Sequence, residues 1–450
     1  MTLNDQLQAA ESPVALLSEP APNYNTAMPY PKVYTNWVDE QTAWHTSAIL
    51  FDQSYHMTDL YITGPDRVRL VSDTAVNSFA NFGAGMAKQY VPVNEQGYVI
   101  GDAILLGLSD DELVIVGNTP CLNWIKYQAK LGNYDVTFVQ DNGGFEGPVP
   151  KRMYRYEVQG PKALQVIEKA VGKAIDPIKF FRMGTFEIAG HKVTALNHTM
   201  AGVPGNDNTG LELFGPYAEG PDVLEALISA GEEFGMLRGG ATSYLSSLVE
   251  SGWIPIPMPP IWGDEPQSKA YRESLPDDSE ERWIPIRGSF RSDNIEDYYA
   301  RPWDLGYERI VKFDHEFIGR AALEASLEKP RRTKVWLEWN REDTQKLLAS
   351  SLMDGDQGAR QIELAANMDT YDEVRADGKL VGFAQIHGWT ANLGAWVSLA
   401  SIDRDAAVDG TEVEITWGDP DGGVGNPFVA PHRQVKIRAV VSVNSPMTKK

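Results

Sequence analysis

The amino-acid sequence predicts an α+β protein whose C-terminal part is a small antiparallel β-barrel. A strand, a Gly-Pro turn and a helix follow one another at residues 57–74, and the same order returns at residues 156–171. After Pro330, short alternating strands are separated by Gly and Asp turns, a texture typical of small barrels. We therefore expect two α+β subdomains over residues 1–330 and an antiparallel barrel over residues 331–450.

Apolar strands are expected at residues 112–116, 136–139 and 192–196 and, in the barrel, at 335–339, 381–386, 395–402, 412–417 and 435–443. A helix with a first-turn proline is expected over residues 221–231. Residues 1–28 contain helix-breaking prolines and are expected to form an irregular arm. Residues 255–287 are rich in Pro and charge, which favours a long surface excursion.

The composition excludes several classes of protein. With 62 acidic and 40 basic residues, the chain has a formal charge of −22, which repels nucleic acid and anionic lipid. The first 25 residues contain no Lys or Arg and no long apolar stretch, so we expect a cytoplasmic protein without a membrane partner. Cys121 is the single cysteine, which excludes an intrachain disulfide, and its apolar neighbours favour a buried core residue over a nucleophile.

Motifs for the common cofactors and metals are absent from the chain. There is no GxxxxGK[ST] loop, no GxGxxG after a strand and no HExxH. The seven histidines show no metal-ligand spacing, and one cysteine cannot ligate a cluster or a multi-cysteine zinc site. We therefore expect no metal ligands.

A series of short segments resembles the aminomethyltransferase (glycine cleavage T-protein) family when taken together. The segments are FDQSYHM at 51–57, GYVIGD at 97–102, GLEL at 210–213, ESG at 250–252, LGY at 305–307 and EFIGRAAL at 316–323. They follow the family's order, and a barrel-like tail stands where the family keeps its C-terminal domain. The resemblance implies the folate-binding aminomethyltransferase fold, with ferredoxin-like antiparallel-sheet subdomains, and tetrahydrofolate as the cofactor.

Further segments are similar to the vanillate and 3-O-methylgallate O-demethylases of this family. They include Tyr30, TNW at 35–37, Gln53 within FDQSYHM, Tyr244 with Trp253, and DYY at 297–299. This resemblance implies a tetrahydrofolate-dependent methyltransferase. It would move the methyl group of a vanillate-, syringate- or methoxybenzoate-like compound to N5 of tetrahydrofolate and release a phenol. Demethylation of a sulfonium or amine donor, and glycine-cleavage aminomethyl transfer, are the alternatives.

The cofactor would be held by residues that match the family motifs. Glu212 is expected to accept hydrogen bonds from the pterin ring, because a carboxylate can take two at once. Asp102 is the second acidic candidate, with a turn-capping Asp as the alternative reading. Trp253 is expected to stack on the pterin or the substrate.

The departing aryl oxygen must be neutralised during methyl transfer, because a phenol has a pKa of about 10 and a bare phenolate leaves slowly. Tyr30 and Tyr244 are the candidate proton donors, with His56 and Gln53 orienting them or the substrate. A tyrosine suits the task because its pKa is close to that of the leaving phenol, which makes the proton transfer nearly balanced.

Recognition of a carboxylate on the donor is left open by the sequence. The vanillate enzymes are expected to meet that carboxylate with a basic side chain, and the apparent counterpart here is Asn118. Either Arg238 or Arg67 takes this role, or the methoxyarene is a differently substituted one.

Overall fold

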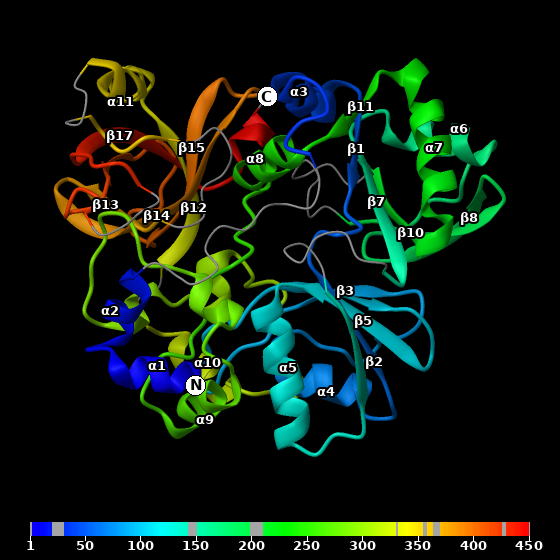
Figure 1. The fold of residues 1–450 in the computed structure, drawn as a ribbon, viewed down its shortest axis with the longest axis horizontal. Helices are drawn as coiled ribbons and strands as arrows, with labels where there is room; N and C mark the ends of the chain where they lie inside the picture. Colours follow the sequence, from blue (N-terminus) through cyan, green and yellow to red (C-terminus); the bar gives the residue numbers. More distant parts are fainter. Residues whose placement is uncertain are drawn as a thin grey trace.

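The computed structural model describes residues 2–19, 31–142, 151–198, 210–329, 332–353, 358–362, 370–424 and 429–449. Within these ranges the chain forms a six-stranded sheet, a five-stranded sheet and a closed six-stranded barrel. The two sheets lie in the right half of Figure 1 and the barrel lies at the upper left. The expected α+β fold with a C-terminal antiparallel barrel is confirmed.

The five-stranded sheet has the order β3-β4-β5-β2-β6, and all its neighbours are antiparallel. Its strands are β2 Thr58–Thr63, β3 Ala87–Tyr90, β4 Ala103–Gly107, β5 Glu112–Gly117 and β6 Thr137–Asp141. Helices α4 (Arg67–Thr74) and α5 (Thr119–Leu131) cover one face. Side chains alternate along β2, so Leu60 packs against these helices while Tyr61 points to the opposite face. Cys121 is buried in the helix-covered core, and burial raises the pKa of its thiol.

The six-stranded sheet has the order β11-β1-β7-β10-β9-β8. Its strands are β1 Ala48–Asp52, β7 Met153–Gln159, β8 Met183–Ile188, β9 His191–Leu196, β10 Gly210–Pro216 and β11 Met236–Gly239. Helices α6 (Ala163–Val171) and α7 (Gly220–Gly231) cover one face, and α3 (Trp37–Thr46) precedes β1. The pair β1 and β11 is parallel, and the other pairs are antiparallel.

The faces of the two sheets that carry no helices turn toward each other. Ile104, Leu106 and Val116 of the five-stranded sheet pack in one cluster with Leu196 and Phe214 of the six-stranded sheet. The two sheets therefore enclose a common interior between them, at the right of Figure 1.

Helix α8 (Ala241–Ser251) connects the six-stranded sheet to the barrel. Glu250 near its end accepts hydrogen bonds from His45 Nε2 (2.8 Å) and from Asn392 Nδ2 of the barrel (2.9 Å). The next turn needs Gly252, because its φ is +76° and a Cβ would lie 2.1 Å from the Trp336 ring. The ESG segment therefore closes α8 tightly onto the barrel.

The barrel closes in the order β12-β15-β14-β13-β16-β17. Its strands are β12 Arg332–Trp339, β13 Asp372–Ala376, β14 Lys379–Thr390, β15 Ala395–Asp403, β16 Glu412–Trp417 and β17 Val435–Ser442. Helix α11 (Arg341–Met353) follows β12. The sequence indicated five of these strands and missed the short β13.

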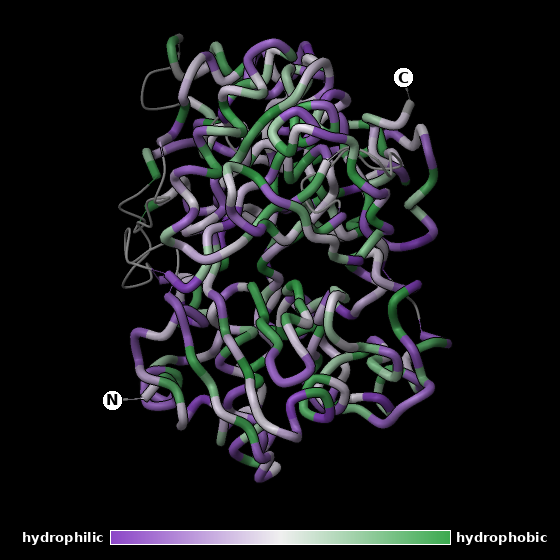
Figure 2. Tube along the Cα trace, turned by 90° about the vertical axis from the view of Figure 1, so that its right-hand side faces the viewer, coloured by the Kyte–Doolittle hydropathy of each residue, from purple (hydrophilic) through white to green (hydrophobic). Residues whose placement is uncertain are grey.

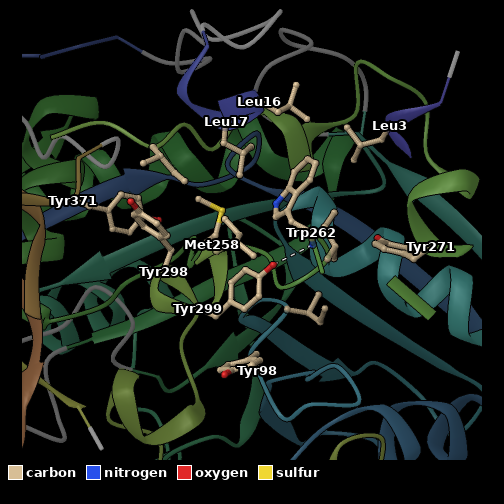
Figure 3. Close-up of a cluster of buried hydrophobic side chains, with 14 of the residues drawn as sticks. Leu3, Leu16, Leu17, Tyr98, Met258, Trp262, Tyr271, Tyr298, Tyr299 and Tyr371 are labelled. Carbon is tan, nitrogen blue, oxygen red and sulfur yellow. Dashed lines mark hydrogen bonds between the residues drawn. The ribbon is translucent and has the colours of Figure 1, made fainter. Parts of the chain in front are cut away.

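The irregular arm expected over residues 1–28 and the surface excursion expected over residues 255–287 are both wrong where the structure describes them, because residues 2–19 are largely helical and both segments are part of a core; residues 20–28 lie outside the described residues. The N-terminal segment forms α1 (Leu3–Ala9) and α2 (Pro13–Ser18), whose first turns are capped by Thr2 and Ser12. Residues 255–287 contain α9 (Pro266–Ser274). These segments pack together in one cluster, which includes Leu3, Leu16, Leu17, Met258, Trp262 and Tyr271 (Figure 3). Their large apolar side chains are spaced irregularly along the sequence. No local periodicity therefore indicated that these side chains pack in a common core.

No helix in the described ranges is long and apolar enough to cross a membrane. Figure 2 shows hydrophobic stretches in both the upper and the lower part of the molecule, with hydrophilic residues at many outer turns.

Candidate active site

A pocket lies between the two sheets, next to the start of α8, and encloses about 430 Å³ of empty space with its mouth included. It is lined by Gln53, His56, Met57, Ile104, Leu106, Val116, Arg155, Glu157, His198, Glu212 and Tyr244. Four residues expected in the site from the sequence, namely Gln53, His56, Glu212 and Tyr244, therefore lie together. The five-stranded sheet supplies the apolar wall, and the six-stranded sheet supplies the polar one.

The polar wall arises from the alternation of side chains along β7. Tyr154, Tyr156 and Val158 pack under α6 and α7 on the covered face. Arg155, Glu157 and Gln159 therefore point to the opposite face, where all three are buried. A buried row of charged and amide side chains is costly unless the groups satisfy one another or a ligand.

Glu212 lies at the centre of this wall and is only 6% exposed. It accepts a hydrogen bond from Arg155 Nη1 (3.0 Å) and one from His198 Nε2 (2.7 Å). Burial alone would raise the pKa of the Glu212 carboxyl, but the bonds and charges of His198 and Arg155 outweigh it and lower this pKa to about 2. Glu212 is therefore ionised at neutral pH.

Arg155 connects Glu212 to the rest of the site. Its Nη2 donates to the backbone carbonyl of His56, and its Nε lies 3.8 Å from Asp59 Oδ1 of the facing sheet. Asp59 also pairs with Lys151 Nζ at 2.8 Å, and both side chains are fully buried. This chain of charges joins the two sheets directly beside the pocket.

Glu157 stands directly opposite Glu212, because the two residues are register partners on β7 and β10. Its carboxyl accepts from Gln159 Nε2 (3.0 Å) and from Gln53 Nε2 (3.4 Å). Burial, reinforced by the charge of Glu212, raises the pKa of Glu157 to about 7, although the charges of His198 and Arg155 oppose this shift. The two facing carboxyl groups thus titrate far apart.

His56 and Tyr244 are in contact at the other side of the pocket. Their rings meet edge to face with centroids 4.8 Å apart, and Tyr244 packs on Phe51 in the same way at 5.3 Å. Burial and the charge of Arg155 lower the pKa of His56 to about 3, so its imidazole is neutral at pH 7. His56 Nε2 is buried and has no hydrogen-bond partner among the described residues.

Asp102 and Trp253 form a second group, which does not line the pocket. Trp253 Nε1 donates to Asp102 Oδ2 over 2.8 Å, and the Tyr307 hydroxyl donates to the same oxygen. Gln89 Nε2 donates to both oxygens, at 2.8 and 2.9 Å. Asp102 directly precedes β4, and Ile104 of this strand lines the pocket. Asp102 is therefore two residues away from a pocket residue in the sequence.

Asn118 and Arg238 lie elsewhere, and Tyr30 is outside the described residues. Asn118 borders a smaller cavity of about 220 Å³, and its Nδ2 donates to the Pro255 carbonyl over 3.1 Å. Arg238 lies over the Tyr34 ring at 3.9 Å and donates to the Tyr34 hydroxyl. In the described ranges, no group of three or more His, Cys, Asp or Glu side chains is arranged to hold a metal ion.

Comparison with known proteins agrees with this geometry. The model of the GCVT N-terminal domain matches residues 15–257, which contain every residue of the pocket. The chain belongs to the aminomethyltransferase family. The family and the transferase class expected from the sequence are thereby confirmed.

Relatives in this family cover nearly the whole chain. The syringate O-demethylase of Sphingobium sp. (strain NBRC 103272 / SYK-6) is 39% identical over 446 residues, which are 98% of this chain and 95% of that protein. The sesamin methylene transferase of Sinomonas sp. (strain No.22) is 27% identical over 81% of this chain and 80% of its own length. An aminomethyltransferase of Saccharopolyspora erythraea is 25% identical over 86% and 87%.

The fold is also similar to a solved structure of the family. The crystal structure of the glycine cleavage system aminomethyltransferase T from Bartonella henselae has a TM-score of 0.59 to this chain. The similarity covers 91% of this chain and 89% of that one at 16% sequence identity. The family fold therefore holds the two sheets and the barrel in this arrangement.

Sequence reasoning missed the three further polar residues of the pocket, Arg155, Glu157 and His198, and its apolar residues Met57, Ile104, Leu106 and Val116. The available signal was three polar residues at alternate positions of a strand, at 155, 157 and 159, directly before the Gly160-Pro161 turn. A polar face of a strand is more often solvated, which is why this alternation did not indicate a site.

Proposed function

We propose that this protein is a tetrahydrofolate-dependent O-demethylase of methoxylated aromatic compounds. It would transfer the methyl group of a syringate-, vanillate- or methoxybenzoate-like ether to tetrahydrofolate and release a phenol. The observation that carries the proposal is a pocket that places the Glu212 carboxyl group, hydrogen-bonded to Arg155 and His198, on one side and Tyr244 in ring contact with His56 on the other. The chain is 39% identical to a syringate O-demethylase over 98% of its length, which supports a methoxylated aromatic compound as the methyl donor.

The residues of the polar wall fit the pterin ring of tetrahydrofolate. The ring presents a ring N–H beside an amino group, and a carboxylate held ionised in a buried site can accept from both. Glu212 meets this need, because Arg155 and His198 fix its orientation and keep it charged. Tetrahydrofolate supplies the nucleophilic N5 that accepts the methyl group.

Tyr244 and His56 assist the leaving group at the opposite side. The Tyr244 hydroxyl stabilises the charge that develops on the aryl oxygen and delivers a proton to it. His56 has an unpartnered ring nitrogen in this apolar region, so it is available to orient the donor or Tyr244. The apolar wall of Ile104, Leu106 and Val116 gives the aromatic ring a surface to pack on.

Asp102 and Trp253 extend this assignment beyond the pocket. Asp102 belongs to a segment that resembles a family motif, Trp253 is one of the residues that resemble the O-demethylases, and the two are hydrogen-bonded to each other. We assign them to the remainder of the folate, with Trp253 held in place by the Asp102 carboxylate. The single cysteine suits a reducing cytoplasm, where we place the enzyme.

The experiment is a donor panel with purified protein and tetrahydrofolate under anaerobic conditions with a chelator. The panel contains methoxybenzoates, methoxyphenols, a methylsulfonium compound and glycine with its carrier protein. We expect 5-methyltetrahydrofolate and a phenol from at least one methoxyarene. Turnover of the sulfonium or of the aminomethyl donor alone would contradict the proposal, and so would demethylation that persists without folate.

A further inference from the structure

Glu157 is a buried carboxyl group for which the assigned chemistry has no use. It lines the pocket and is 3% exposed. Its register partner across the sheet is Glu212, and directly opposed residues on antiparallel strands have Cβ atoms about 4.5–5.5 Å apart. Two like charges in this relation are destabilising, so the pair calls for a physical explanation.

The neighbours of Glu157 do not provide one. Among the described residues, the side chains that donate to it are the neutral amides of Gln159 and Gln53, and the Gln53 bond is long at 3.4 Å. The nearby cations bond to the other carboxylate, because Arg155 and His198 both donate to Glu212. Glu157 therefore has spare acceptor capacity that faces the pocket.

The pterin of the proposed function presents one more donor than Glu212 can accept. Its amino group carries two hydrogens, and a bidentate carboxylate takes one of them together with the ring N–H. The second amino hydrogen diverges from the first and needs another acceptor. An acceptor on the neighbouring strand, opposite the first carboxylate, is in a suitable place.

We infer that Glu157 is a second pterin acceptor, which takes the amino hydrogen that Glu212 leaves, so that a pair of facing carboxyl groups recognises reduced folate. This inference rests on the proposed function and adds a specificity-determining residue to it. The same pair disfavours ligands that lack the amino group, because Glu157 would then keep only its amide donors and Glu212 would receive one ligand hydrogen bond in place of two.

Binding then changes the protonation of Glu157. Without folate, burial and the charge of Glu212 hold the pKa of Glu157 at about 7, so the group is about half protonated at neutral pH. A donor from the ligand favours the ionised form, and the proton passes from the Glu157 carboxyl to the buffer as the complex forms. The groups facing Glu157, namely Glu212, His198, Arg155, Gln159 and Gln53, are present before and after binding.

The test is calorimetry of tetrahydrofolate binding at pH 7 in two buffers of different ionisation enthalpy. We expect wild type to release about half a proton more than Glu157→Gln, because the protonated fraction of Glu157, about half at pH 7, loses its proton on binding. The variant should also bind roughly tenfold more weakly, since a charge-assisted bond becomes a neutral one. Glu281→Gln is the matched control, because Glu281 is a buried carboxyl held by Asn123 and Tyr271 outside the pocket.

A second measurement needs no variant. The affinity of wild type for tetrahydrofolate should improve as the pH rises from about 5.5 through 7 and level off above about 8, because Glu157 is then already ionised without ligand. Equal proton release from wild type and Glu157→Gln, or a flat affinity profile, would overturn the role of Glu157. Absence of folate binding and of methyl transfer in wild type would instead overturn the proposed function.

Discussion

Arg155 Nη1 donates a 3.0 Å hydrogen bond to Glu212 Oε1 from the adjacent strand. The bond gives Glu212 two tasks, because the residue proposed to hold the pterin is also the counterion of a buried arginine. His198 depends on the same carboxylate through its 2.7 Å bond. A change at Glu212 therefore affects the stability of the fold as well as ligand binding.

Glu212→Ala should lower the free energy of unfolding by about 3–5 kcal/mol, because it leaves Arg155 and His198 buried without their partner. Glu212→Gln keeps the shape and one acceptor oxygen, so it should unfold closer to wild type. Its affinity for tetrahydrofolate should still fall by about 2–3 kcal/mol, on the scale of charge-assisted hydrogen bonds. Urea denaturation and calorimetry of both variants separate the two effects.

Wild-type folate affinity in Glu212→Gln would show that the pterin binds elsewhere. The pH offers an independent check on the structural part. The pKa of Glu212 is depressed to about 2, so its stabilisation is present above the unfolded value of about 4.3 and is lost as the pH falls toward 2.

The sequence could predict the elements with a regular local pattern. The two strand–Gly-Pro–helix units became β2 with α4 and β7 with α6, because alternation and the turn residues fix them locally. The cluster around Trp262 and Leu17 could not be predicted, since its residues come from segments far apart in the sequence. Their burial depends on tertiary contacts that leave no periodic trace in either segment.

The candidate site also contains residues that the sequence could predict and residues that it could not. Motif resemblance located Glu212, His56, Gln53 and Tyr244, and the pocket contains all four. Arg155 could not be predicted as a site residue. It becomes the counterion of Glu212 only because β7 lies between β1 and β10 and faces the second sheet. A buried counterion is a property of the assembled fold, so no spacing along the chain indicates it.

Trp253→Phe should lower the free energy of unfolding by about 0.5–1.5 kcal/mol, the net value of a hydrogen bond. The change removes the indole N–H that donates to Asp102 and keeps an aromatic ring. Tyr307→Phe removes a second donor from the same carboxylate oxygen and should cost a similar amount. Urea denaturation of both single variants and the double variant measures these losses.

The double variant should differ clearly from the sum of the single ones, because the two donors share one acceptor. Strict additivity, or unchanged stability of Trp253→Phe, would show that Trp253 and Tyr307 do not hold the Asp102 side chain together.

His56→Asn should make the protein less sensitive to acid. The pKa of His56 is lowered to about 3 by burial and by Arg155, whereas the unfolded chain titrates near 6.5. Below pH 6.5 the unfolded state therefore binds more protons, and stability falls as the pH falls toward 3. At pH 5 this contribution is about 2 kcal/mol, which the variant should lack.

Urea denaturation at pH 8 and pH 5 measures the difference, and the other titrating groups cancel between the two proteins. His191→Asn is the control, because His191 is partly exposed and pairs with Asp222 away from the pocket. If both variants keep the wild-type difference between pH 8 and pH 5, the His56 imidazole is not buried in its neutral form.

Tyr244→Phe should lower the rate of methyl transfer by about 10²–10⁴-fold with little effect on donor binding. Phenylalanine keeps the edge-to-face contacts with Phe51 and His56 and deletes only the hydroxyl. The bond from this hydroxyl strengthens as negative charge develops on the leaving oxygen, so its loss falls on the transition state. We expect the same of Tyr30→Phe, and single-turnover rates measure both.

The leaving group provides the decisive comparison. A more acidic phenol needs less help to depart, so the defect of Tyr244→Phe should shrink across ring-substituted methyl ethers as the phenol becomes more acidic. A structural tyrosine would instead slow good and poor leaving groups by the same factor. Phe51→Leu removes the ring that packs on Tyr244 but leaves the Tyr244 hydroxyl in place. This variant should therefore slow good and poor leaving groups by the same factor. If Tyr244→Phe behaves like Phe51→Leu, the proton comes from another group.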